Sequence, residues 1–230
     1  NMACGFYGLL AVHVGSYTVA GIAILLGILF DMLDGRVARL VHGESSFGIE
    51  FDSLSDFLTF GVTPAYMMYG LFLKDFGVIG TVVVLFYALC GGLRLARFNA
   101  LAHGGKGSKS YFQGLPIPAA AGFLASWVLL YTLLEQQRPE PTLGWLMDQI
   151  PRLGGAGSFF MVLLSFLMIS SIPYAAFKQS NLFTLKNYKL LIAVGIAAGL
   201  LYFYPENAIF LIFLFYILSG FTGLILRLRE

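Results

Sequence analysis

The chain has 230 residues, of which 58% are hydrophobic and only 11% are charged, with a net charge of +2 and a mean hydropathy of +0.82. Soluble domains are about 45–50% apolar and about 25% charged, so the composition excludes a large soluble domain and gives no indication of nucleic-acid binding. It predicts an all-α, polytopic integral membrane protein. The two cysteines, Cys4 and Cys90, lie in apolar segments and predict buried thiols rather than a disulfide framework.

Eight apolar segments approach the ~20 residues that a membrane-spanning helix needs. In chain order they are predicted near residues 1–13, 17–42, 47–73, 77–102, 117–136, 156–175, 188–203 and 207–228. Clusters of glycine, proline and charged residues separate them as turns and loops. We expect one membrane-embedded domain over 1–230, with a helical hairpin over 17–73. The first segment is short and begins at Asn1, so we expect a preceding segment to be missing.

The distribution of Lys and Arg predicts the orientation of these segments. If the turn at 42–46 faces the cytosol, eleven of the 14 Lys and Arg residues fall on the cytosolic side. Only Lys74, Arg138 and Arg152 fall on the other side. This is the bias of the positive-inside rule, and it places the stretch 31–56 on the cytosolic side.

The stretch 31–56, DMLDGRVARLVHGESSFGIEFDSLSD, contains four aspartates. Asp31 and Asp34 share a face of the helix before the HGESS turn, and Asp52 and Asp56 share a face of the helix after it. An antiparallel hairpin brings these two faces together. Carboxylates gathered in this way repel one another unless cations lie between them, and their oxygens suit Mg²⁺, Mn²⁺ or Ca²⁺. Four negative charges favour two ions.

Two other interpretations of the aspartates were weighed. A single aspartate at a helix end usually caps the helix or pairs with an arginine, but four at matched spacings favour a functional site. Intramembrane carboxylates also suit a cation-coupled transporter, which needs polar residues along a path across the membrane. Here the acids gather at one level and the far halves of the spans are almost wholly apolar. This favours an enzyme at the membrane interface, where Gly35, Ala38 and Gly48 leave room for a flat or bulky ligand.

The same stretch reads D-x-x-D-G-x-x-A-R, then eight residues, then G-x-x-x-D-x-x-x-D. It resembles the signature of the CDP-alcohol phosphatidyltransferase family. The residues that match in identity and spacing are Asp31, Asp34, Gly35, Ala38, Arg39, Gly48, Asp52 and Asp56. FDSLSDFLTFGVTPA at 51–65, GGLRLARFNA at 91–100, FQGLPIPAAAG at 112–122 and IPYAAFK at 172–178 resemble the branch of that family that uses serine.

The resemblance implies a reaction between a CDP-linked diacyl- or dialkylglycerol and L-serine, which gives a serine phospholipid and CMP. It implies two divalent cations, Mg²⁺ or Mn²⁺, with Asp56 also acting as general base on the serine hydroxyl. The metal ligands that it implies are Asp31, Asp34, Asp52 and Asp56. The residues that it assigns to CDP binding are Asp31, Asp34, Gly35, Ala38, Arg39 and Gly48. It also implies a homodimer.

Four polar residues outside the signature are candidates for binding the pyrophosphate or the serine, namely Arg94, Arg97, Asn99 and Gln113. Arg94 and Arg97 share a helix face near the cytosolic end of the fourth span, and guanidinium groups bind both phosphate and carboxylate. Their alternative role is anchoring at the membrane interface. For the reaction, the open alternatives are a related transferase that uses glycerol phosphate or inositol phosphate, and the transporter.

Overall fold

The computed structural model describes residues 1–40, 45–103, 111–135, 156–175 and 203–227, and within these ranges the chain is almost entirely helical. The α-helices are α1 (Met2–His13), α2 (Tyr17–Leu40), α3 (Ser46–Asp56), α4 (Thr63–Met68), α5 (Gly77–His103), α6 (Ile117–Glu135), α8 (Ala156–Ile169) and α10 (Pro205–Arg227). Seven of the eight predicted segments fall mainly within the described ranges, and each of these seven contains a helix. The segment predicted at 188–203 lies outside the described residues except for Phe203.

The described helices are apolar enough to be membrane helices. Two continuous helical stretches, Tyr17–Ala38 and Ser46–Leu101, are long and apolar enough to cross a bilayer by length and composition. Shorter apolar helices cover Met2–His13, Ile117–Leu133, Gly157–Ile169 and Pro205–Gly220. The all-α class expected from the sequence is therefore observed.

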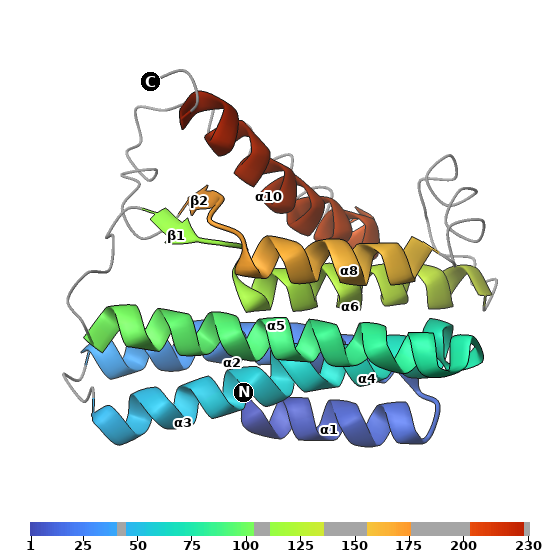
Figure 1. Cartoon of the computed structure of the whole chain (residues 1–230). Helices are drawn as coiled ribbons and strands as arrows, with labels where there is room; N and C mark the ends of the chain where they lie inside the picture. The colour runs from blue at the N-terminus through green and yellow to red at the C-terminus, as the bar shows by residue number, and fades with distance from the viewer. Residues whose placement is uncertain (41–44, 104–110, 136–155, 176–202, 228–230) are drawn as a thin grey trace.

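The helices form a layered bundle (Figure 1). Helices α1 to α5 run along one another on one side of the bundle, α6 and α8 lie on the other side, and α10 crosses obliquely over α6. Helix α2 packs on both α1 and α6, while α5 packs on α8. The C-terminal end of α2 and the start of α3, which carry parts of the signature region, extend together with the end of α5 beyond the first residues of α1 and α6 (Figure 1).

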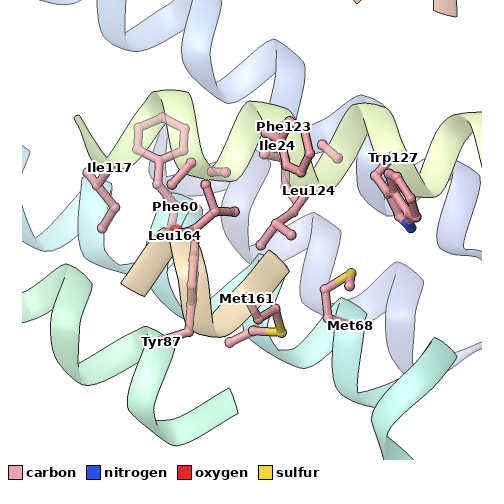
Figure 2. Close-up of a cluster of buried hydrophobic side chains, with 14 of the residues drawn as sticks. Ile24, Phe60, Met68, Tyr87, Ile117, Phe123, Leu124, Trp127, Met161 and Leu164 are labelled. Atoms are coloured by element: carbon pink, nitrogen blue, oxygen red, sulfur yellow. The ribbon is translucent and has the colours of Figure 1, made fainter. Parts of the chain in front are cut away.

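Helix α6 is the centre of the bundle. Every residue from Ala119 to Leu130 is buried, as expected of a helix that is apolar on all sides. Figure 2 shows its side chains Phe123, Leu124 and Trp127 surrounded by residues of neighbouring helices. Those neighbours include Ile24, Phe60, Met68, Tyr87, Met161 and Leu164. The core therefore lies between α6 and the layer that carries the aspartates.

The helix that begins at Ser46 continues to Phe76, but it contains two π-helical segments, η1 (Phe57–Val62) and η2 (Tyr69–Leu73), before the 3₁₀ turn η3 (Lys74–Phe76). Segment η1 starts directly after Asp56. The Thr63 hydroxyl lies 2.8 Å from the Leu58 carbonyl and 3.0 Å from the Gly5 carbonyl of α1. π-Helical turns often mark functional sites, and this one is tied to α1 by a side chain.

Close packing of α1, α2 and η1 depends on two glycines facing Thr59, which is fully buried. A Cβ atom at Gly5 would lie 2.8 Å from Thr59 Cα, and one at Gly27 would lie 2.6 Å from Thr59 Cγ2. Both distances are shorter than real Cβ contacts allow. Small residues at these positions let the helix backbones approach each other closely.

A short antiparallel ladder joins β1 (Tyr111–Gln113) and β2 (Pro173–Ala175). The sequence had predicted helix as far as residue 175, but α8 ends at Ile169. Pro173 explains the difference, because proline lacks a backbone N–H and restricts the residue before it to extended conformations. Each of these strands has only three residues. That is too short for an alternation of polar and apolar residues to be visible, so the sequence analysis did not predict them.

The guanidinium of Arg97 joins this ladder to the end of α8. Its Nη1 donates to the carbonyl of Ile169 at 3.0 Å, and its Nη2 donates to the carbonyls of Gln113 at 2.6 Å and Ser170 at 3.2 Å. The last carbonyls of a helix have no intrahelical partner, and a basic side chain at that end also interacts favourably with the helix dipole. Arg97 therefore has a structural role, which the sequence analysis did not foresee.

The substitution Gly27→Ala is expected to destabilise the fold, because the added methyl group meets Thr59 Cγ2. Overpacking of this kind costs about 1–3 kcal/mol. Thr59→Ser removes that methyl group and keeps the hydroxyl, which donates to the Asn1 carbonyl at 3.2 Å. The double substitution should therefore melt at a higher temperature than Gly27→Ala alone. Thermal unfolding of the four proteins in detergent completes a double-mutant cycle, and purely additive effects would contradict the contact.

Arg97→Lys is expected to lower the melting temperature, because an ammonium group cannot span three carbonyls as a planar guanidinium does. A hydrogen bond to a charged group contributes about 1.5–3 kcal/mol, so losing even one is measurable. Arg36→Lys, at an exposed arginine of α2, is the matched control. Equal melting temperatures of the two variants would be incompatible with the structural role of Arg97.

Candidate active site

The candidate site is built on the hairpin of α2 and α3. Helix α2 has 24 residues, so it is about 36 Å long and exceeds the ~30 Å of the hydrocarbon core. Its last turns are largely exposed. Helix α3 begins after Ser45, whose Oγ accepts a hydrogen bond from the backbone N–H of Gly48 at 3.0 Å. This N-cap fixes where the second half of the signature becomes helical.

Three of the four predicted aspartates meet between these helices. Carboxylate oxygens of Asp31, Asp52 and Asp56 all lie within 4.8 Å of one another. Asp56 is 9% exposed, Asp31 is half-buried and Asp52 is exposed. Asp34 is exposed on the same face of α2, within electrostatic range of Asp31 and Asp52. The hairpin therefore brings Asp31 close to both Asp52 and Asp56.

The aspartates are mutually repulsive in this arrangement. Two carboxylates at about 4.8 Å repel each other by roughly 3–4 kcal/mol at an effective dielectric constant of about 20. Partial burial adds a desolvation cost to each charge. The cluster, which we define as Asp31, Asp52 and Asp56, therefore needs positive charge or protons to be stable, and it is suited to receiving cations.

Asn1 is a member of the site that the sequence analysis did not identify. Its Nδ2 donates a hydrogen bond to Asp56 Oδ1 at 2.7 Å. Its Oδ1 is buried and has no hydrogen-bond partner in the described part of the chain. This oxygen points toward α2, 3.3 Å from where a Cβ atom of Gly27 would lie, one turn before Asp31. A single asparagine at the start of an apolar segment was the only signal for it.

These oxygen atoms fit a hard divalent cation. Mg²⁺ and Mn²⁺ prefer oxygen ligands, and the site offers three carboxylates whose oxygens lie within 4.8 Å of one another. The chemistry of the donors, rather than any single distance, is what matches such an ion.

The two arginines of α5 point to different neighbours. Arg94 lies within electrostatic range of Asp56 and Asp31, and its Nε is buried without a hydrogen-bond partner among the described residues. Arg97 donates to the backbone carbonyls at the end of α8 and in β1. Only Arg94 therefore places positive charge next to the aspartate cluster through interactions that the structure describes.

The remaining predicted residues lie around the hairpin. Gly35 and Ala38 are half-buried on α2, and Gly48 is exposed in the first turn of α3. The side chain of Arg39 lies outside the described part of the structure. Gly35 and Ala38 continue the face of α2 that carries Asp31 and Asp34, where a ligand next to the aspartates would contact them.

Asn99 and Gln113 occupy different surroundings. Asn99 Nδ2 donates to Ser53 Oγ at 2.9 Å. It lines a groove of about 250 Å³ between α3 and α5, together with Glu50, Ser53, Leu54, Phe57, Gly92, Leu95 and Ala96. The side chain of Gln113 is exposed, and its backbone carbonyl is the acceptor for Arg97.

Comparisons with known proteins bear on what this site does. Residues 1–150 match the sequence profile of the CDP-alcohol phosphatidyltransferases. The chain is 36% identical over 222 residues to the CDP-diacylglycerol–serine O-phosphatidyltransferase of Helicobacter pylori strain J99, covering 94% of this chain and 84% of that protein.

Two archaeal proteins are also similar. The archaetidylserine synthase of Methanothermobacter thermautotrophicus is 40% identical over 179 residues, covering 76% of this chain and 65% of that protein. The CDP-diacylglycerol–serine O-phosphatidyltransferase of Methanocaldococcus jannaschii is 38% identical over 167 residues, covering 73% and 67% respectively. The resemblance seen in the signature is thereby confirmed over most of the sequence, and the chain belongs to the CDP-alcohol phosphatidyltransferase family.

Proposed function

We propose that this protein transfers a phosphatidyl group from a CDP-linked diacyl- or dialkylglycerol to the hydroxyl of L-serine, with release of CMP. The observation that carries this proposal is the cluster of three carboxylates at the family signature, with oxygens within 4.8 Å of one another. The choice of serine is supported by the names of the relatives, which act on serine or make archaetidylserine.

The location of the site suits one lipid and one soluble substrate. The aspartates lie on α2 and α3, whose ends extend past the first residues of α1 and α6 (Figure 1). A lipid held by its tails in the bilayer can bring its headgroup there, and a soluble amino acid can arrive from the aqueous side. Arg36 and Arg94 lie toward this end of the bundle, and Lys74 lies in η3 at the opposite end. This supports the proposal that the site faces the cytosol.

In this proposal Asp31, Asp34, Asp52 and Asp56 hold two divalent cations, Mg²⁺ or Mn²⁺. Such cations neutralise the pyrophosphate and stabilise charge on the attacking and leaving oxygens. Asn1 holds Asp56 in this arrangement through the hydrogen bond from its Nδ2. Gly35, Ala38, Arg39 and Gly48 border the space for the CDP group.

Asp56 is proposed as the general base. Its Oδ1 is held by the Asn1 amide at 2.7 Å, which orients the carboxylate and leaves Oδ2 to accept a proton. The serine hydroxyl oxygen attacks the phosphorus that carries the lipid, and its proton passes to Asp56. The bond between that phosphorus and the bridging oxygen breaks, and CMP leaves with the electron pair. Burial of Asp56 limits competition from water for the same proton position.

The homodimer and the single domain over 1–230 remain predictions from the resemblance and the composition. Neither is needed for the chemistry described above, because all the residues proposed to act on the substrates come from one chain.

The proposed reaction is tested by CMP release from CDP-diacylglycerol by the purified protein with Mg²⁺ or Mn²⁺. We expect release with L-serine, but not with glycerol phosphate or inositol phosphate, whose phosphates call for a denser basic pocket. EDTA should abolish turnover and added Mn²⁺ should restore it. CMP release that depends on another acceptor would reassign the substrate, and full activity in EDTA would rule out the metal.

Asp56→Asn is expected to lower kcat by about 10²–10⁴-fold, the usual contribution of a general base. The KM for the CDP-lipid should change much less, because the amide keeps the size of the carboxylate. Asp75→Asn, at an exposed aspartate in η3, is the matched control and should retain the wild-type kcat. A near-wild-type kcat of Asp56→Asn would show that another group removes the proton.

A further inference from the structure

The π-helical segment η1 follows Asp56, the proposed general base, without a break in the helix. Its hydrogen bonds span five residues, as in the bond from the backbone N–H of Thr63 to the carbonyl of Leu58. A π-helical turn is much rarer than an α-helical one, and contacts with α1 and α5 stabilise this one. The groups that hold η1 therefore also determine where Asp56 lies.

Tyr87 of α5 supplies a hydrogen bond that the helix itself cannot make. In an α-helix the N–H of residue 64 would donate to the carbonyl of residue 60, but Pro64 has no N–H. The Tyr87 hydroxyl donates to the Phe60 carbonyl at 3.2 Å, and both side chains lie fully buried in the cluster of Figure 2. An unpaired buried carbonyl costs about as much free energy as a lost hydrogen bond, so Tyr87 stabilises η1 from the side of α5.

Thr59 connects the same turn to Asp56 through α1. Its hydroxyl donates to the backbone carbonyl of Asn1 at 3.2 Å, and Asn1 Nδ2 donates to Asp56 Oδ1 at 2.7 Å. Thr59 is fully buried and lies three residues after Asp56. One short segment of helix therefore holds Asn1 by its backbone and is held by its side chain, and this closed set of contacts keeps the Asn1 amide directed at Asp56.

We propose that Thr59 and Tyr87 are positioning residues for Asp56. Tyr87 fixes the backbone of η1 at Phe60. Thr59 fixes Asn1 against that backbone, and Asn1 orients the carboxylate. The inference rests on the proposed function, because it takes Asp56 as the group that receives the proton of the acceptor hydroxyl. Both hydroxyls are bound to backbone carbonyls, so they affect the reaction only through Asp56.

The test removes each hydroxyl with little change in the size of the side chain. Thr59→Val and Tyr87→Phe are expected to lower kcat about 10–100-fold, because small displacements of a reacting group have effects of this size. The KM for CDP-diacylglycerol should be nearly unchanged. Thr59→Ser keeps the hydroxyl and should keep the wild-type kcat, although the loss of a buried methyl group lowers its melting temperature.

Thr18→Val is the matched control. The Thr18 hydroxyl donates to Thr132 Oγ1 at 3.1 Å and joins α2 to α6, so the substitution removes a hydrogen bond between helices that does not involve η1. We expect it to lower the melting temperature and to leave kcat unchanged. A loss of kcat in Thr18→Val as large as that in Thr59→Val would overturn the positioning role.

A double-mutant cycle distinguishes positioning from a general loss of structure. Asp56→Asn leaves no carboxylate to be oriented, so adding Thr59→Val or Tyr87→Phe to it should lower the residual kcat less than about twofold. Equal fold-losses of kcat in the wild-type and Asp56→Asn backgrounds would overturn the positioning role. Equal fold-losses of kcat in Thr59→Ser and Thr59→Val would do the same.

Mn²⁺ binding, measured by EPR spectroscopy without substrates, separates this inference from the proposed function. Asp56 belongs to the cluster whose oxygens lie within 4.8 Å of one another. Thr59→Val and Tyr87→Phe should therefore weaken Mn²⁺ binding about 10-fold, as is typical when a group that orients a metal ligand is lost. This result in a protein that releases no CMP with any acceptor would support the positioning and refute the proposed reaction. Unchanged Mn²⁺ binding together with unchanged kcat in both variants would overturn the positioning.

Discussion

Electrostatic repulsion among three carboxylates in largely apolar surroundings is the constraint that the rest of the bundle has to satisfy. Their oxygens lie within 4.8 Å of one another, so the fold must hold α2 and α3 together at the point where they repel most. Gly5 of α1 and Gly27 of α2 pack closely against Thr59 of η1, three residues after Asp56, and this packing holds the helices together next to the site. The Asn1 amide adds a hydrogen bond to Asp56. A packed region without these small residues would let the helices separate and relieve the repulsion.

The change in helix geometry after Asp56 belongs to the same arrangement. The π-helical segment η1 begins at the next residue, and Thr59 and Thr63 within and after it bind carbonyls of α1. The widened turn therefore brings hydroxyl groups toward α1 while Asp56 keeps its α-helical relation to Asp52. Asp52 and Asp56 lie on the α-helix α3, whereas the hydrogen bonds to α1 come from threonines in and just after the π-helical segment η1.

Arg94 and Arg97 show how one helix serves the site and the scaffold at once. They are three residues apart on α5, yet Arg94 is near the aspartates and Arg97 binds carbonyls of Ile169, Ser170 and Gln113. Arg97 thereby fixes the strand β1 against the end of α8. One guanidinium group therefore places positive charge near the aspartates, and the other joins the ladder to the end of α8.

The sequence alone determined the helical class and the aspartate cluster, because both depend on spacings within a helix. Apolar segments of sufficient length predict membrane helices, and spacings of three and four place Asp31 with Asp34 and Asp52 with Asp56. It did not predict Asn1, the ladder or the partners of Arg97. The hydrogen bond from Asn1 to Asp56 joins residues 55 positions apart, and that from Arg97 to Ile169 joins residues 72 apart. Such contacts are decided only when the helices pack, because the packing of the whole bundle, and not the local periodicity, determines which distant backbone groups meet.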